Sequence, residues 1–182
     1  MKPLLLLLCV PTLVSAGASD AYLGARLGQS YFHDACTGAA CEERTLGAGL
    51  YGGVNLTPWL ALEAGINDYG EPHAQHASGR TRLALYSAEL STKLTWPLSE
   101  QVSLHTRLGT AYQIIDKRAD WACKQTSYTW QPLLAVGFKY PLLPELSLRA
   151  EYQFIDGVGE RAIGKADVHF TSLGLTYHLP KE

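Results

Sequence analysis

The feature that most constrains the fold is an alternation of apolar side chains with small or polar ones. It recurs in eight segments, and no long stretch of helical periodicity separates them. Successive side chains of a β-strand point to opposite faces of a sheet, so a period of two predicts strands. The predicted strands lie near 21–31, 45–55, 59–69, 83–96, 102–115, 129–140, 146–156 and 168–179. The chain is therefore expected to be all-β.

The connections between these segments are of two kinds that alternate along the chain. Three are short and carry proline, namely Asn55-Leu56-Thr57-Pro58, Pro97-Leu98-Ser99-Glu100 and Pro141-Leu142-Leu143-Pro144. The others, near 32–44, 70–82, 116–128 and 157–167, are longer and more polar. Short turns at one end and long loops at the other are typical of an outer-membrane barrel. A soluble barrel can have the same eight strands, so the face that meets water has to be identified.

The two faces of the predicted strands differ in composition. One is rich in glycine and alanine, including Gly28, Gly47, Gly109 and Ala135, and the other carries mostly leucine. The interior of an eight-stranded barrel is barely wide enough for side chains, which favours small residues there. We expect the small and polar face to point inward and the leucine face to meet lipid. Aromatic residues near the strand ends fit two membrane interfaces: Trp96, Tyr140, Tyr177, Tyr31, Tyr112, Trp130 and Phe154.

The N-terminus has the pattern of a secretory signal peptide. Lys2 precedes an apolar stretch that is too short to span a membrane as a helix, and small residues follow it. Residues 1–18 are the predicted signal, with cleavage after Ala16 or after Ala18, and residues 19–182 form one barrel domain. The net charge is −2 and no basic tract occurs, which argues against binding of nucleic acid.

Three cysteines remain in the exported chain. Cys36 and Cys41 are close enough for a local disulfide in an oxidising compartment, and Cys123 would then be left over. Three loop thiols without a fixed pairing are the alternative.

The final predicted strand resembles the signal that the outer-membrane assembly machinery recognises. That signal combines a glycine, an aromatic residue and a last apolar residue, here Gly174, Tyr177 and Leu179. The chain continues for three residues beyond Leu179 and lacks a terminal Phe or Trp.

Along nearly all of the predicted barrel domain the sequence resembles the transmembrane domain of the OmpA family. The resemblance is carried by Tyr22-Leu23-Gly24-Ala25-Arg26-Leu27-Gly28, Leu46-Gly47-Ala48-Gly49-Leu50-Tyr51-Gly52-Gly53, Thr92-Lys93-Leu94-Thr95-Trp96-Pro97 and Arg149-Ala150-Glu151-Tyr152-Gln153. It implies an eight-stranded antiparallel up-and-down transmembrane barrel in the bacterial outer membrane, with both termini and the short turns on the periplasmic side. Larger relatives continue into a periplasmic peptidoglycan-binding domain where this sequence ends, so no wall-anchoring role is expected.

Ionisable residues on the inward face are the candidate functional set. They are Arg26, Glu63, Glu89, Lys93, Arg107, Lys139, Arg149 and Glu151. Charges in a narrow lumen are costly unless they are paired, so we expect an interleaved ion-pair network. The OmpA resemblance implies a gate at Glu63, Lys93 and Arg149, but relatives carry Glu where this chain has Lys139. The network can therefore be purely structural or can act as a gate.

No constellation in the sequence predicts catalysis, a metal or a cofactor. His169 and Ser172 invite comparison with a lipid-modifying outer-membrane enzyme, but residues three apart on a strand point to opposite faces. We expect a non-enzymatic, monomeric barrel with a structural or surface role and weak passage of small solutes. Outer-membrane lipids, lipopolysaccharide and the assembly machinery are the expected partners. A surface adhesin or receptor acting through the loops is the alternative, and a lipid-modifying enzyme is less favoured.

Overall fold

The computed structural model describes residues 20–33, 40–42, 44–71, 73–76, 79–119, 122–158 and 166–180. Within these ranges the elements are strands, and none is a helix that could cross a membrane. The strands are β1 (Asp20–His33), β2 (Ala40–Glu42), β3 (Arg44–Asn55), β4 (Leu60–Asp68), β5 (His73–His76), β6 (Gly79–Pro97), β7 (Ser103–Ala119), β8 (Ala122–Pro141), β9 (Leu146–Val158) and β10 (Ala166–His178).

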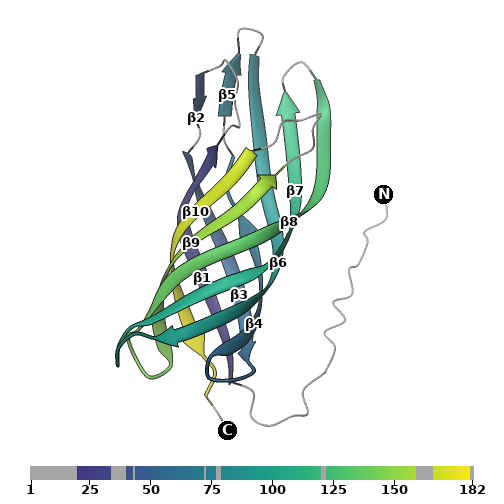
Figure 1. The fold of residues 1–182 in the computed structure, drawn as a ribbon. Coiled ribbons are helices and arrows are strands. Elements are labelled where there is room, and N and C mark those ends of the chain that lie inside the picture. The colour runs from purple at the N-terminus through teal and green to yellow at the C-terminus, as the bar shows by residue number, and fades with distance from the viewer. Residues whose placement is uncertain are drawn as a thin grey trace.

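The strands form one antiparallel sheet that closes on itself. Its order is β2-β5-β6-β4-β3-β1-β10-β9-β8-β7, and the additional pairing of β6 with β7 completes the ring. Eight strands make up the barrel, tilted relative to its axis (Figure 1), whereas β2 and β5 lie beyond one of its ends. The first and last strands pair from Tyr22↔His178 to His33↔Asp167. The prediction of a closed, eight-stranded, antiparallel barrel is confirmed.

The three short turns at the other end of the barrel share one hydrogen-bonding pattern. The backbone N–H of Leu56, Leu98 and Leu142 each donates to the carbonyl four residues later, at 2.8–2.9 Å. In two of these turns a hydroxyl adds a second contact, since Thr57 Oγ1 and Ser99 Oγ each accept a backbone N–H at 3.0 Å. Side-chain acceptors of this kind stabilise tight turns, which explains how such short segments reverse the chain.

The two faces of the barrel wall differ as the alternation predicts. Leu108 and Leu175 on the outer face are 56% and 48% exposed, whereas Arg107 on the inner face is 1% exposed. Trp96, Tyr140 and Tyr177 also face outward near the short turns, and Trp130 does so toward the opposite end. The wall is therefore apolar outside, as contact with lipid requires, and carries charged side chains inside.

Two inward glycines show why that face contains small residues. A Cβ atom at Gly28 would lie 2.2 Å from the carbonyl oxygen of Thr171 on the neighbouring strand. A Cβ atom at Gly109 would lie 2.2 Å from the carbonyl oxygen of Leu90. No real Cβ atom comes this close, so glycine permits the close approach of these strands.

The end of the barrel opposite the short turns contains more β-strand than predicted. The predicted loop 70–82 contains β5 and the start of β6, and the predicted loop 116–128 contains a ladder in which Lys117 pairs with Gln125. Gly70, with a φ of 84°, separates β4 from β5. These predictions were wrong because both segments are polar at most positions of either parity. Their backbone ladder persists while the apolar alternation that reveals a strand is lost.

Candidate functional site: a lumenal ion-pair network

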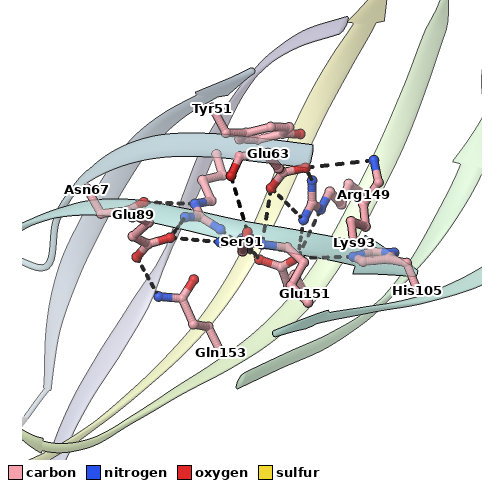
Figure 2. A network of polar contacts seen from close by, with 12 residues as sticks. Tyr51, Glu63, Asn67, Glu89, Ser91, Lys93, His105, Arg149, Glu151 and Gln153 are labelled. Carbon is pink, nitrogen blue, oxygen red and sulfur yellow. Dashed lines mark hydrogen bonds and ion pairs between the residues drawn. The ribbon is translucent and has the colours of Figure 1, made fainter. Parts of the chain in front are cut away.

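The structure places all eight predicted ionisable residues on the inner wall of the barrel. Seven of them contact one another within the described part of the chain: Arg26, Glu63, Glu89, Lys93, Arg107, Arg149 and Glu151. They come from strands far apart in the sequence, and their side chains converge across the lumen (Figure 2). Lys139 lies apart from this group.

Glu89 lies in the part of the network nearer the cell-surface end of the barrel. Arg26 and Arg107 each donate through Nη2 to Glu89 Oε2, at 3.0 and 2.8 Å. Glu89 Oε1 accepts from the hydroxyl of Tyr69 at 2.6 Å and from the amide of Gln153 at 2.7 Å. Both carboxylate oxygens are therefore bound by donors, which is the condition for a buried charge to be tolerated.

Glu151 lies at the centre of the network. It accepts from Nη1 of Arg26 at 2.7 Å, from Nη1 of Arg107 at 2.8 Å, and from the guanidinium of Arg149. The Nε2 atom of His105 lies 3.0 Å from Glu151 Oε2. Three arginines thus share one carboxylate that is almost entirely buried, one arginine more than contacts Glu63 or Glu89.

Glu63 holds the part of the network nearer the short turns. Arg149 donates to both of its oxygens, at 2.8 and 3.2 Å, and Arg107 Nε lies 3.1 Å from Oε1. The hydroxyl of Tyr22 donates to Oε2 at 2.8 Å. Lys93 is more distant, with 3.7 Å between its Nζ and Oε2. The residues expected from the OmpA gate are thus in contact, but two arginines compete with Lys93 for the same carboxylate.

Lys139 takes no part in an ion pair among the described residues. It is half-buried on the inner wall near the short turns, directly across the ladders from Arg149 and Ser103. Its electrostatic environment includes Arg149 and Asp20. Lys139 and Arg149 carry like charges on directly paired strand positions, so Lys139 offers Arg149 no ion-pair partner.

A ring of mostly apolar side chains lies in the surface half of the lumen, above the charged layer, and the polar Ser30 and Gln113 are buried at the same end. It includes Ile155 and Phe170, which are fully buried, and the ring of Tyr69 packs edge-on against that of Phe170 at 5.3 Å. The full set is Phe32, Tyr69, Leu85, Ala111, Ile115, Leu133, Ile155, Val168 and Phe170. The lumen is therefore ionic in its middle and mostly apolar toward the surface, an arrangement that was not predicted from the sequence.

Side chains outside the predicted ionisable set also belong to the network. His105, Tyr22, Tyr69 and Gln153 each bind one of the three carboxylates. Three of them have the inward parity of their strands, and Tyr69, directly after β4, continues the inward parity of that strand. The parity of polar residues, and not only of charged ones, is therefore the signal that could have found them.

Of the remaining predicted sites, the structure describes the assembly signal, whereas Cys36 and the signal peptide lie outside the described residues. Gly174 faces the lumen, and Tyr177 and Leu179 are 43% and 48% exposed on the outer wall. Cys36 lies outside the described residues, as do residues 1–18, so the disulfide and the signal peptide stay predictions. No group of metal-ligating side chains occurs in the described ranges.

His169 and Ser172 lie on opposite sides of the barrel wall. His169 faces outward, where its Nδ1 atom is 2.6 Å from the hydroxyl of Tyr152, and Ser172 is buried inside. These two residues therefore cannot act together on one substrate.

The chain is similar to known outer-membrane proteins over most of its length. Outer membrane protein A of Escherichia coli O157:H7 is 30% identical over 163 residues, which cover 86% of this chain and 46% of that protein. Its counterpart in Salmonella typhi is 28% identical over 172 residues, covering 88% of this chain and 49% of that protein. The chain thus spans about half the length of these curated relatives.

Solved structures support the same fold at low sequence identity. Neisserial surface protein A matches with a TM-score of 0.71 at 15% identity, over 90% of this chain and all of that chain. Ail, the attachment invasion locus protein of Yersinia pestis, matches with a TM-score of 0.60 at 12% identity, over 88% of this chain and 99% of that chain. The family described as OmpA-like transmembrane domain matches residues 16–182. This chain therefore belongs to the OmpA-like transmembrane domain family and is a β-barrel of the bacterial outer membrane.

Proposed function

We propose that this protein is a structural, surface-presenting barrel whose lumen is closed at rest and conducts small anions only weakly. The observation that carries the proposal is the filled interior, with buried ion pairs in the middle and buried apolar rings toward the surface. An eight-stranded barrel has just enough interior for its own side chains. Ions can pass only when some of these side chains move, so openings should be rare and brief.

The charge of the lumen favours anions during such openings. Five basic residues (Arg26, Lys93, Arg107, Lys139, Arg149) face three acidic ones (Glu63, Glu89, Glu151) on the inner wall. Fixed positive charge in a narrow pore lowers the energy of anions and raises that of cations.

Planar-bilayer recordings of the purified barrel test this proposal. We expect small, intermittent currents with an anion preference, and a long-lived open state of large conductance would overturn it. Phe170→Ala, which removes a fully buried ring from the apolar layer, should make openings more frequent. Leu173→Ala on the outer face of the same strand is the matched control, because Leu173 is 61% exposed and does not face the lumen.

The proposed partners follow from the outer wall and the last strand. The exposed leucines of the wall fit the acyl chains of outer-membrane lipids and of lipopolysaccharide. We propose that the assembly machinery recognises the last strand through Gly174, Tyr177 and Leu179. Leu179→Asp should lower the amount of barrel in the outer membrane, and unchanged levels would exclude that role for the last strand.

Adhesion is a second candidate function. It is favoured by the ladders that rise beyond the barrel at the surface end, where β2, β5, β6, β7 and β8 extend (Figure 1). A surface projection of this kind suits contact with a partner, and the structurally similar Ail is named an attachment invasion locus protein. Replacing 118–124 with a short turn should then reduce binding of whole cells to host surfaces without changing barrel folding.

A further inference from the structure

The outer wall of the barrel contains an apolar groove of about 820 Å³, which we call the wall groove. Two rows of outward side chains border it, and each row crosses the sheet through direct ladder partners on neighbouring strands. On β10, β1 and β3 one row is Leu175, Ala25 and Leu50, and the other is Leu173, Leu27 and Ala48. The two rows are two residues apart along each strand, so the groove runs across the strands.

Small residues make room for the wall groove. Ala25 and Ala48 stand in rows that are otherwise leucine on these three strands, and the backbone at Gly49 and Gly174 forms the floor between the rows. Leu27 and Leu173 at its border are 70% and 61% exposed. The groove therefore opens to the outside of the barrel and not to the lumen.

The size and course of the wall groove fit a flexible apolar chain. Its volume lies within the roughly 300–1,000 Å³ of small-molecule pockets. Two residues of a strand span only about 7 Å, whereas a helix with its side chains is about 10–12 Å across and cannot enter. From Leu50 the groove continues through Ile66 on β4 to Ala88 on β6, so it winds around the barrel. The convex wall of a second barrel could touch only part of this course, whereas an acyl chain can bend along it.

A polar and aromatic cluster lies on the same strands, two rows beyond the groove. Arg44, Tyr31 and His169 are ladder partners there, and all three face outward. The guanidinium carbon of Arg44 lies 6.0 Å from the centre of the Tyr31 ring, and the ring centres of Tyr31 and His169 are 6.0 Å apart. This cluster is at the end opposite the short turns, which face the periplasm in outer-membrane barrels, so it faces the surface leaflet. An exposed guanidinium at that level suits a phosphate group, to which arginine donates charge-assisted hydrogen bonds.

The distance between this cluster and the groove matches the depth of one leaflet. Tyr31 and the floor residue Arg26 are five residues apart on β1, which is about 17 Å along an extended strand. At the usual strand tilt this corresponds to roughly 13 Å of depth. Half of the hydrocarbon core is about 15 Å thick. An acyl chain that extends inward from a head group beside Arg44 therefore reaches the groove.

Two carboxylates lie near this path. Asp68 borders the groove as the ladder partner of Ala48, and its Oδ1 atom accepts the backbone N–H of Gly70 at 2.8 Å. Asp167 is two residues beyond His169 and has a contact of its own. The apolar part of the groove therefore lies on β10, β1 and β3, on the strands that also carry the cluster around Arg44.

We propose that the wall groove binds an acyl chain of lipopolysaccharide whose phosphorylated lipid A head group contacts Arg44. This site rests on the proposed contact of the outer wall with lipopolysaccharide and deepens it, because it gives one lipid molecule a fixed position. It requires neither conduction nor adhesion.

Native mass spectrometry of the folded barrel, titrated in detergent micelles with diphosphoryl lipid A, tests this site. We expect saturable binding of one lipid A. Ala48→Phe should weaken it at least about tenfold, because the ring takes the place of several methylene groups. Ala64→Phe is the matched control, because it adds the same ring at an exposed alanine that does not border the groove, and it should change the affinity by less than about twofold. Absence of saturable binding to the wild type, or equal weakening by both variants, would overturn the proposal.

Two comparison lipids test the choice of occupant. Lipid A without its phosphates should bind more weakly than the phosphorylated form, and Arg44→Gln should remove that difference. Phosphatidylethanolamine should also bind more weakly than phosphorylated lipid A. Equal affinity of the wild type for all three lipids would show that the groove takes any acyl chain, and it would overturn the assignment to lipopolysaccharide.

A further measurement needs no variant. Lipid A with a nitroxide on one acyl chain should broaden the amide NMR resonances of Gly49 and Gly174 in the wild-type barrel more than that of Gly137. Gly137 is the matched reference, because it lies four residues before the end of β8, as Gly174 does before the end of β10, and does not border the groove. Equal broadening at all three glycines would contradict a fixed site.

The two proposals can fail separately. Anion currents in planar bilayers without saturable lipid A binding would remove this inference and leave the proposed function standing. Lipid A binding without any current would remove only the conduction claim.

Discussion

Replacing Glu151 with glutamine should destabilise the barrel more than any neutral surface change. The substitution keeps the size of the side chain but removes the negative charge that three arginines share at 2.7–3.0 Å. It also places an amide group, itself a donor, against guanidinium donors. Removing one partner from a buried ion pair typically costs about 3–5 kcal/mol, and Glu151, with a side chain 1% exposed, meets that condition.

Unfolding by urea of the barrel reconstituted in lipid vesicles, followed by tryptophan fluorescence, measures this loss. Glu145→Gln is the matched control, because it makes the same chemical change at an exposed turn and should alter the free energy of unfolding by less than about 0.5 kcal/mol. The slopes with urea must agree for the free energies to be compared. If Glu151→Gln unfolds within about 1 kcal/mol of the wild type at equal slope, the network does not carry the stability assigned to it.

Three further outcomes are expected. Leu175→Arg on the lipid face should lower the free energy of unfolding of the inserted barrel by about 2–4 kcal/mol, while Glu71→Arg at the surface end should change it little. If both variants unfold in lipid vesicles like the wild type, the face assigned to lipid would instead be the inner face. Lys139→Glu should weaken or reverse the anion preference measured by reversal potentials in planar bilayers. An unchanged preference would mean that Lys139 does not contribute to the anion preference. Joint replacement of Cys36 and Cys41 by serine should leave the heat-modifiable form on SDS gels, because the barrel ladders do not depend on a local loop closure; loss of that form would refute this.

The barrel and the inward charges could be predicted because both depend on a local rule. Parity along each strand assigns a side chain to the lumen or to lipid, and this rule placed Arg26, Glu89 and Glu151 correctly on the inner wall. Which charges pair could not be predicted. Arg26 reaches Glu89, 63 residues away, and Glu151, 125 residues away, through the tilt and stagger of a closed barrel. The tilt and stagger depend on all strands of the closed sheet together, so the sequence of one strand does not predict them.

The apolar ring has a sequence signal that the alternation alone conceals. Adjacent apolar pairs interrupt the period of two at Ile114-Ile115, Leu133-Leu134 and Phe154-Ile155. In each pair one residue faces outward while Ile115, Leu133 or Ile155 is buried inside. A strand that is apolar on both faces near the surface end therefore indicates a filled lumen at that level. The ladders at the surface end had no such signal, because their segments are mostly polar and lack the apolar alternation.

The mobility of the protein on SDS gels, compared with and without boiling of an outer-membrane fraction, tests the central claim most directly. A closed barrel with complete ladders resists SDS until it is heated, so the unboiled protein should migrate at a different position from the boiled one. The same mobility in both samples, together with recovery of the protein in the soluble periplasmic fraction, would contradict the account of an outer-membrane barrel with a filled, ion-paired lumen.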